Sequence, residues 1–595
     1  MRTFARVLRM LRRPGRWKRR RGRLVTVELD GLPADLPPDP RRPWVVLDVH
    51  VRGGSVGQVF ERAPEGLTGA RQLELVATRL GGPAAHRAVR MALRDALTGG
   101  TPENAGPIPP VSVVICTRDR PDDLAVCLSA TARLDPPPLE VIVVDNAPGS
   151  EATSDLCAAH PGVVHVVEPV PGLCRARNRG IAVARGAWVA FTDDDCVPEP
   201  DWLAPLAAAA RDPLVSAVCG HALPLEVEAP SQYLFEAHGG FERHPDRWVH
   251  DPIAHPPHGV AFTAGAGANM ILRRDALLAI GGFRADTGPG SAAPLSDEKE
   301  VFLRLALAGH RLVHDPASRV RHRHRREPEL LRSTLRSYGR SEVAFALYAA
   351  ARHRAWRGLA TPRWWVRHSL GDLRSSVRDR PRSVPARLAL EELGGMLEGP
   401  AAAWRALRTP PVPLPPAAEP AALERIEVGA EAPAVSVALA THQRRESVVE
   451  TLRGLAQQTL APERFEVVVV VDGSTDGTAA AVRELALPFG LRVHEQANRG
   501  LAATRNAGAA LAAHPLVVFL DDDIRPDPDW LAAHAARHAE TGDRVVLGIY
   551  PPRLPGPGSD WWTQAVAAWW ADHFRRKLEP GHRWTLLDVI DGNLS

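Results

Sequence analysis

The chain has 595 residues, enough for several domains with separate cores, and its 45% hydrophobic and 24% charged residues are ordinary for globular proteins. The formal net charge of +4 hides an asymmetry, because residues 1–23 hold eleven Arg or Lys and no acid, which leaves −7 for the rest. No apolar run reaches 18 residues, so the sequence excludes a membrane-spanning helix, and residues 1–23 lack the apolar core of a signal peptide.

The basic tail at residues 1–23 suits an anionic surface, which is either a membrane or a nucleic acid. No nucleic-acid-binding motif accompanies it, so we expect no nucleic-acid partner. Apolar residues at helical spacing between its arginines predict a short helix on an anionic membrane surface, with a disordered tail as the alternative: Phe4, Val7, Leu8 and Leu11. The six cysteines have no metal-ligand or C-x-x-C spacing, so we expect reduced thiols and a cytoplasmic chain, at the inner face of the cell membrane.

The next segments differ in composition. Residues 24–98 predict a small α+β module with strands near 24–29, 44–51 and 55–60 and a helix near 85–97. A linker rich in Gly and Pro follows at 99–110.

Residues 111–330 alternate strand and helix patterns. Apolar, β-branched runs without polar alternation predict strands buried on both faces of a mainly parallel sheet: Val113–Cys116, Val141–Val144 and Val189–Thr192. Helical patterns lie between them, at Asp122–Ala132 and Arg175–Ala184. The pattern predicts an open α/β sheet, which binds ligands at the carboxyl ends of its strands.

Three further segments complete the chain. Residues 331–408 predict a helical region with interleaved Arg and Trp, and its 352–367 stretch would add to a membrane contact. Residues 409–434 are a Pro-rich linker, and 435–595 return to the α/β pattern.

An internal repeat organises the chain. "VSVVICTRDR" at Val111 recurs as "VSVALATHQR" at Val435, and "AFTDDDCVPEPDWL" recurs as "VFLDDDIRPDPDWL". The matched positions keep their order, pairing Asp145 with Asp472, Asn178 with Asn506, Asp193 with Asp521 and Asn269 with Asn593. Conserved order with small changes of spacing indicates two duplicated domains.

Three consecutive acids, Asp193, Asp194 and Asp195, follow an apolar strand. Adjacent carboxylates repel one another and need a cation, and oxygen ligands favour Mg²⁺ or Mn²⁺, which a diphosphate would share. The alternative is a solvated turn, but the recurrence at Asp521–Asp523 favours a metal–diphosphate site.

Two other polar groups belong to the same sheet edge. Asp145 ends a buried strand, where its carboxylate can accept hydrogen bonds from a base or a ribose, or cap a helix. Arg177 and Asn178 precede the acidic strand and recur as Arg505–Asn506; a guanidinium there can bind phosphate.

These ordered blocks resemble the family 2 glycosyltransferases, which are inverting enzymes of the GT-A fold, from Val111 to about Arg326 and again from Val435. The resemblance implies two nucleotide-diphospho-sugar transferase domains. It implies that Thr117 and Asp145 line the nucleotide pocket, and that Asp193 and Asp195 serve ribose, diphosphate and metal.

The resemblance also suggests the acceptor side and the base. "GAGANMILRRDALLAIGGF", which includes Gly267 and Asn269, is similar to the family's segment beside the acceptor. "SDEKEVFLRLALAGHRLVHD" is similar to the block that carries the catalytic base, which implies Glu298 as the base with Asp297 as second choice. His322 falls where related enzymes place a metal-ligating histidine; a solvated basic run is the alternative.

The second copy supplies a nucleotide half-site from residues equivalent to those of the first: Thr441, Asp472, Arg505, Asn506, Asp521 and Asp523. The counterparts of 272–326, with the acid pair and the histidine, are missing after Asn593. We expect either a fragment of a longer protein or a second domain that binds without catalysing.

The implied function is the transfer of a sugar, with inversion, from a nucleotide-diphosphate donor to a glycan or lipid-linked acceptor. The alternatives are a non-catalytic nucleotide-sugar-binding scaffold and a sugar-nucleotide nucleotidyltransferase. The latter needs a glycine-rich phosphate loop after the first strand, where this chain has "TRDRPDD".

Overall fold

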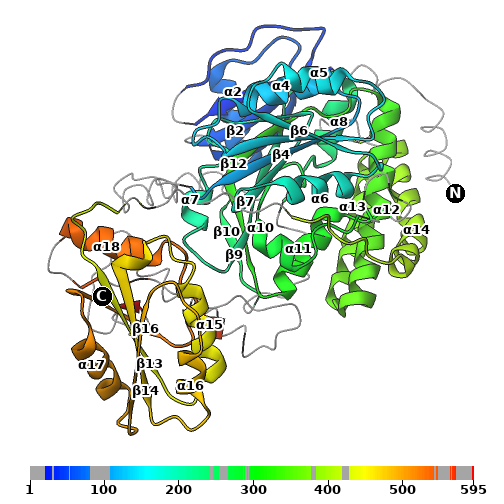
Figure 1. Cartoon of the computed structure of the whole chain (residues 1–595). Coiled ribbons are helices and arrows are strands. Elements are labelled where there is room, and N and C mark those ends of the chain that lie inside the picture. The colour runs from blue at the N-terminus through cyan, green and yellow to red at the C-terminus, as the bar shows by residue number, and fades with distance from the viewer. Residues whose placement is uncertain are drawn as a thin grey trace. The chain divides into compact units, whose positions relative to one another are not determined.

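A computed structural model describes residues 21–29, 32–51, 54–80, 108–241, 246–252, 265–285, 287–288, 291, 294–376, 384–417, 426, 428–541 and a few scattered positions beyond. The chain divides into two compact units, residues 1–421 with 554–569 and residues 422–553 with 570–595. Each unit is described by itself (Figure 1). The basic tail at 1–20 and the helix expected at 85–97 lie outside the described residues.

The N-terminal module holds three strands in the order β1 (Gly22–Glu28), β2 (Trp44–Val51) and β3 (Gly54–Arg62). One face of this sheet, including Val45 and Leu47, packs under α2 (Gly69–Arg79), a helix that the sequence reading did not predict. The other face carries Trp44, Val46 and Phe60 and packs on Tyr233 of the next domain.

The central sheet of the first unit has nine strands. Its path runs β10-β12-β9-β11-β7-β4-β5-β6, and β8 pairs with β12. The strands are β4 (Val111–Thr117), β5 (Glu140–Asn146), β6 (Val163–Glu168), β7 (Trp188–Asp193), β8 (Cys196–Pro198), β9 (Val215–Pro224), β10 (Trp248–His250), β11 (Met270–Arg273) and β12 (Arg311–His322). β7, β4, β5 and β6 are parallel neighbours, whereas β11 runs antiparallel to β7 and β9.

Apolar layers cover both faces of this sheet, as the absence of polar alternation predicted. One layer includes Leu124, Leu128 and Trp202, and the other includes Ile181, Phe283 and Phe302. The helices around the sheet are α4 (Pro121–Thr131), α5 (Ala152–Ala158), α6 (Leu173–Val183), α7 (Leu206–Ala209), α8 (Pro230–His238), α10 (Arg274–Ala279) and α11 (Asp297–Leu307).

A helical region follows, made of α12 (Pro328–His353), the short 3-10 helix η2 (Trp356–Leu359), α13 (Ala360–Ser375) and α14 (Ala386–Arg408). α12 and α14 approach closely because glycines lie at their contact: a Cβ on Gly395 would lie 1.9 Å from the carbonyl oxygen of Arg336. The helices therefore meet backbone to backbone, and ion pairs such as Arg332–Glu391 flank the contact.

The second unit repeats the first sheet on a smaller scale. Its order is β15-β14-β13-β16-β17, which matches β6-β5-β4-β7-β11. The elements are β13 (Val435–Thr441), α15 (Arg445–Leu455), η3 (Pro462–Arg464), β14 (Phe465–Asp472), α16 (Thr478–Arg483), β15 (Gly490–Gln496), α17 (Leu501–Leu511), β16 (Leu516–Asp521), α18 (Trp530–Thr541) and β17 (Asn593–Leu594). The expected duplication of an open, mainly parallel α/β sheet is confirmed.

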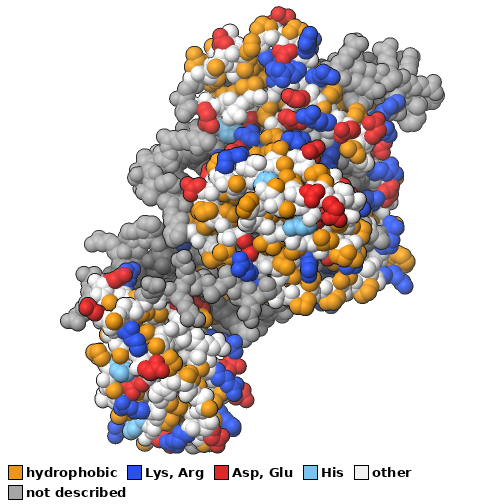
Figure 2. Space-filling view, turned by 45° about the horizontal axis from the view of Figure 1, so that its top comes forward, with side chains coloured by type: hydrophobic (Ala, Val, Ile, Leu, Met, Phe, Trp, Pro, Cys, Tyr) orange, Lys and Arg blue, Asp and Glu red, His pale blue; other side chains and the backbone are white. Residues whose placement is uncertain are grey.

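The surface is of mixed character: hydrophobic, basic and acidic side chains are interspersed over the face seen in Figure 2. Among the described residues, no helix combines the length and the hydropathy that crossing a bilayer requires.

Candidate active site

A cavity of about 1290 Å³ opens at the carboxyl ends of β4 and β7. Residues at the ends of these strands form one side, and the side chains of α8, α11, α12 and α13 form the others. This is the sheet edge at which open α/β folds bind ligands.

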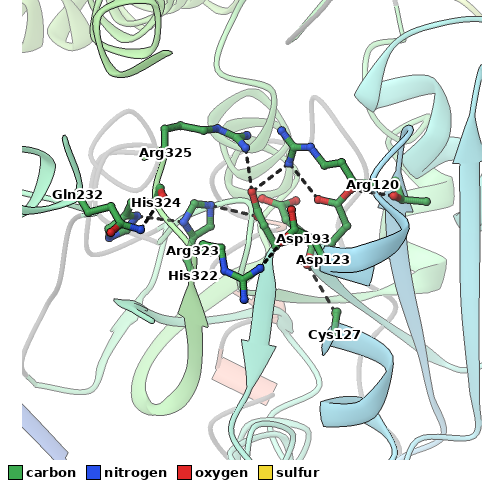
Figure 3. A network of polar contacts seen from close by, with 12 residues as sticks. Arg120, Asp123, Cys127, Asp193, Gln232, His322, Arg323, His324 and Arg325 are labelled. Carbon is green, nitrogen blue, oxygen red and sulfur yellow. Dashed lines mark hydrogen bonds and ion pairs between the residues drawn. The ribbon is translucent and has the colours of Figure 1, made fainter. Parts of the chain in front are cut away.

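The three acids after β7 lie in this cavity, and each has different partners. Asp194 accepts a hydrogen bond from the Thr117 hydroxyl at 2.8 Å and one from Arg120 at 3.2 Å. Asp195 lies 3.1 Å from Arg120, 3.3 Å from Arg325 and 3.3 Å from Nε2 of His322. Figure 3 shows the two arginines reaching the acids from opposite sides.

These different surroundings shift the pKa values of the acids and of His322 in different directions. Burial raises the pKa values of Asp193 and Asp194, the latter to about 6. For Asp195 burial is outweighed by His322, Arg325 and Arg120, which lower its pKa. Burial lowers the pKa of His322 to about 4, so its imidazole is neutral at pH 7.

This cluster fits a divalent cation. Ligand atoms of Asp195, Cys196 and His322 lie within 4.8 Å of one another. A carboxylate and a neutral imidazole are ligands that Mn²⁺ accepts, and the Asp193 carboxylate adds an oxygen donor in the same cavity. So small a set of protein ligands suits a metal that a diphosphate also ligates.

Arg177, which we expected to bind phosphate, lines the cavity and is engaged there by protein groups. Its guanidinium is buried, forms an ion pair with Asp297 and lies 3.7 Å from Asp193. It also donates to the carbonyl of Gly267 at 3.3 Å and lies over the ring of Phe283. Arg177 therefore neutralises two acids at the wall of the cavity.

The pairing of Arg177 separates the two candidate bases. Both line the cavity, but Asp297 is buried and engaged by the guanidinium, whereas Glu298 is half-buried. Burial and the neighbouring Asp297 raise the pKa of Glu298 to about 8. A carboxylate with a raised pKa is a stronger base once it is ionised.

The register of β5 differs from the expected pairing of Asp145 with Asp472. Thr117 of β4 pairs with Asp145, but its counterpart Thr441 of β13 pairs with Val471, so the structural equivalent of Asp472 is Asn146. Successive residues of a strand face opposite sides of a sheet. Asn146 lines the cavity and accepts from the backbone N–H of Gly172, whereas buried Asp145 lies 3.6 Å from Nε2 of His165 and does not line it.

Two asparagines that we expected at the site, Asn178 and Asn269, do not line the cavity and instead form hydrogen bonds with backbone groups. Asn178 exchanges two hydrogen bonds with the backbone of Phe283. Asn269 donates to the carbonyls of His221 and Ser318 and accepts from Trp202. Gly267 does line the cavity, and a Cβ there would lie 3.0 Å from the Arg177 guanidinium.

The sequence reading missed several residues that line the cavity. Arg120 was detectable, because Arg444 recurs at the equivalent position of the second copy and likewise contacts the acids. Arg325 lies in the basic run that surrounded His322. An aromatic wall left no sequence signal, because its members come from separate elements: Phe235, Phe241, Tyr338 and Trp365.

The second unit reproduces part of the arrangement. Thr441 donates to Asp522, and Arg444 contacts both Asp522 and Asp523. Arg505 lies 2.7 Å from Asp521, and Asn506 is exposed. Asp472 accepts from the backbone N–H groups of Arg499 and Gly500, as Asn146 does from Gly172.

The fold and the acid-bearing strand ends define a GT-A-type domain, present twice. Glycosyl transferase family 2 matches residues 112–259 and 436–594, and glycosyl transferase family group 2 matches 188–373. The chain belongs to glycosyl transferase family 2, in a tandem arrangement.

Individual relatives match shorter stretches. Validoxylamine A glucosyltransferase of Streptomyces hygroscopicus subsp. limoneus is 41% identical over 131 residues, 21% of this chain and 29% of the relative. Glucosyl-dolichyl phosphate glucuronosyltransferase of Haloferax volcanii is 26% identical over 225 residues, 36% of this chain and 69% of the relative. The chain spans less than a third of the length of the first two relatives it matches.

A solved structure with a partial likeness is the mannosyltransferase PcManGT from Pyrobaculum calidifontis in complex with GDP-Man and Mn²⁺. It is 20% identical, has a TM-score of 0.30 and covers 57% of this chain and 86% of its own.

Proposed function

We propose that the first unit transfers a sugar, with inversion, from a nucleoside-diphosphate donor to a hydroxyl of a glycan or lipid-linked acceptor. The observation that carries the proposal is the placement of Glu298 and the Asp193–Asp195 cluster in one cavity. A carboxylate that can act as a base and a site for a cation suit displacement of a diphosphate by a hydroxyl.

The donor occupies the strand-end side in this proposal. Asp195 and His322 would hold Mg²⁺ or Mn²⁺, with Asp193 beside them, and the metal would supply positive charge to the departing diphosphate. Arg120 and Arg325 lie within ion-pair distance of Asp195 and add positive charge at the same place. Thr117 positions Asp194 rather than the donor, because the Thr117 hydroxyl donates its hydrogen bond to the Asp194 carboxylate.

Glu298 accepts the proton of the acceptor hydroxyl. The acceptor oxygen forms a bond to the anomeric carbon as the bond from that carbon to the diphosphate breaks. Attack from the side opposite the leaving group gives inversion. A lipid-linked acceptor would place this reaction at the cytoplasmic face of the cell membrane.

The second unit, in this proposal, binds a nucleotide-sugar at the carboxyl ends of its strands. The support is the recurrence of the Thr441–Asp522–Arg444 contacts and of the Arg505–Asp521 pair. The nucleotidyltransferase alternative finds no support in the loop after β4, which has no glycine and holds Arg120 against the acids.

The test is a screen of nucleotide-sugars by thermal shift and donor hydrolysis, with and without Mn²⁺. We expect one donor to stabilise the first unit only with metal, and Asp195→Ala to abolish this effect. A folded chain that responds to no donor would favour the scaffold alternative. A response that persists in Asp195→Ala but disappears in Asp523→Ala would place the donor in the second unit.

A further inference from the structure

The outer face of α14 is apolar although it faces solvent. In Figure 1 this helix forms the outer edge of the helical region. Leu390, Leu397 and Trp404 are 39%, 85% and 60% exposed. They are spaced by seven residues, two turns of helix, so they share one face. Leu407, 42% exposed, extends this apolar face to a length of about 26 Å at 1.5 Å per residue.

The opposite face of α14 is buried within the first unit. Leu388, Ala402 and Ala406 are buried, and Gly395 contacts α12. α14 is therefore apolar on two faces, and the packing of the first unit buries only one of them. The exposed face therefore belongs to an interaction outside the unit.

Charge indicates the kind of partner. Within α14, all of whose residues the structure describes, the three acids point away from the exposed apolar face: Glu391 and Glu398 pair with α12 arginines, and Glu392 is buried beside His238 and Ser369. Exposed arginines border the apolar face instead: Arg387, Arg405 and Arg408. Arg408 lies over the ring of Trp404, with its guanidinium carbon 4.9 Å from the ring centroid.

A single helix with a convex apolar face, an exposed Trp and bordering arginines is the pattern of helices that lie in the interface of an anionic bilayer. We propose that Leu390, Leu397, Trp404 and Leu407 of α14 insert into an anionic lipid surface, with Arg405 and Arg408 at the headgroups. The partner is the membrane itself, so the inference goes beyond the proposed function, although it would bring the cavity to a lipid-linked acceptor.

The experiment is co-sedimentation of the full chain with vesicles, without donor or metal. One vesicle type contains equal parts of phosphatidylcholine and phosphatidylglycerol, and the other contains phosphatidylcholine alone. We expect binding to the mixed vesicles that weakens at high salt, and a loss of affinity of about tenfold or more in Leu397→Glu/Trp404→Glu.

The matched control is Leu32→Glu/Leu139→Glu, which adds the same two charges at exposed leucines of the first unit. It should bind as the wild type does. Circular dichroism melts and donor hydrolysis should be unchanged in both double variants, because the exposed face of α14 does not line the cavity.

Three results would overturn the proposal. The first is no binding to mixed vesicles. The second is equal binding by the wild type and Leu397→Glu/Trp404→Glu, which would assign lipid binding to another part of the chain. The third is self-association in solution, measured by light scattering, that the same variant abolishes, which would make a second copy the partner.

Discussion

Arg177 gives the two neighbouring acids at the start of α11 different surroundings. Both carboxyl groups line the cavity, but Asp297 is ion-paired with Arg177, and the proposed mechanism therefore uses Glu298. The sequence order Asp-Glu did not distinguish the two residues, because the distinction depends on a partner 120 positions earlier in the chain.

The raised pKa of Glu298 predicts the pH dependence of turnover. A base acts when ionised, so kcat/KM for the donor should rise with pH, about tenfold per unit, and level off near pH 8. Asp297→Asn removes a negative charge that raises this pKa, so the rise should move to lower pH. A profile that levels off near the ordinary pKa of glutamate, unmoved in Asp297→Asn, would contradict the assignment.

His322 should contribute to metal affinity. Its imidazole is neutral at pH 7 and lies 3.3 Å from Asp195. We expect His322→Ala to weaken apparent Mn²⁺ affinity by about tenfold or more, measured from the metal dependence of donor hydrolysis. His160→Ala, at a half-buried histidine outside the cavity lining, should leave that affinity unchanged. Equal Mn²⁺ affinities in the two variants would exclude His322 as a ligand.

At the scale of elements, the register of β5 decides which of its last two residues lines the cavity. Asn146 hydrogen-bonds the backbone of Val170 and Gly172 and so shapes the loop that lines the cavity. We predict that Asn146→Ala weakens donor binding in calorimetry, whereas Asp145→Asn does not. The reverse ranking would restore the assignment made from sequence.

The α12–α14 contact gives a prediction about stability. Gly395→Ala places a Cβ 1.9 Å from a backbone oxygen, so it should destabilise the first unit by about 1–3 kcal/mol. Gly371→Ala, in α13 with no atom within 4 Å of the new Cβ, should be neutral or stabilising by up to about 1 kcal/mol. Denaturant unfolding compares the two, and equal effects would contradict the close contact.

A feature could be predicted from the sequence when the residues that determine it lie within a short stretch of the chain. Buried parallel strands and strand-end acids were predictable, because apolar runs and the repeat reveal them within short windows. The equivalence of Asn146 and Asp472 was not, since a one-residue shift between similar strands changes the face without changing the pattern. The inward roles of Asn178 and Asn269 depend on backbone partners 105 and 48 residues away.

At the scale of the whole molecule, the duplication yields two sheets with different surroundings. Both copies hold the middle acid through a Thr and an Arg, which marks this contact as part of the fold. In the first unit the cavity is completed by α8, α11 and the helical region, which supply Glu298 and the aromatic wall. The proposed chemistry therefore belongs to the first unit.

The most direct test of this account is turnover by the full chain carrying Glu298→Gln, measured as nucleoside diphosphate release beside donor affinity. We predict unchanged donor binding and a rate lower by about 10²-fold or more, because only the proton acceptor is removed. A near-normal rate with normal donor binding would show that the base lies elsewhere and would contradict the assignment of Glu298.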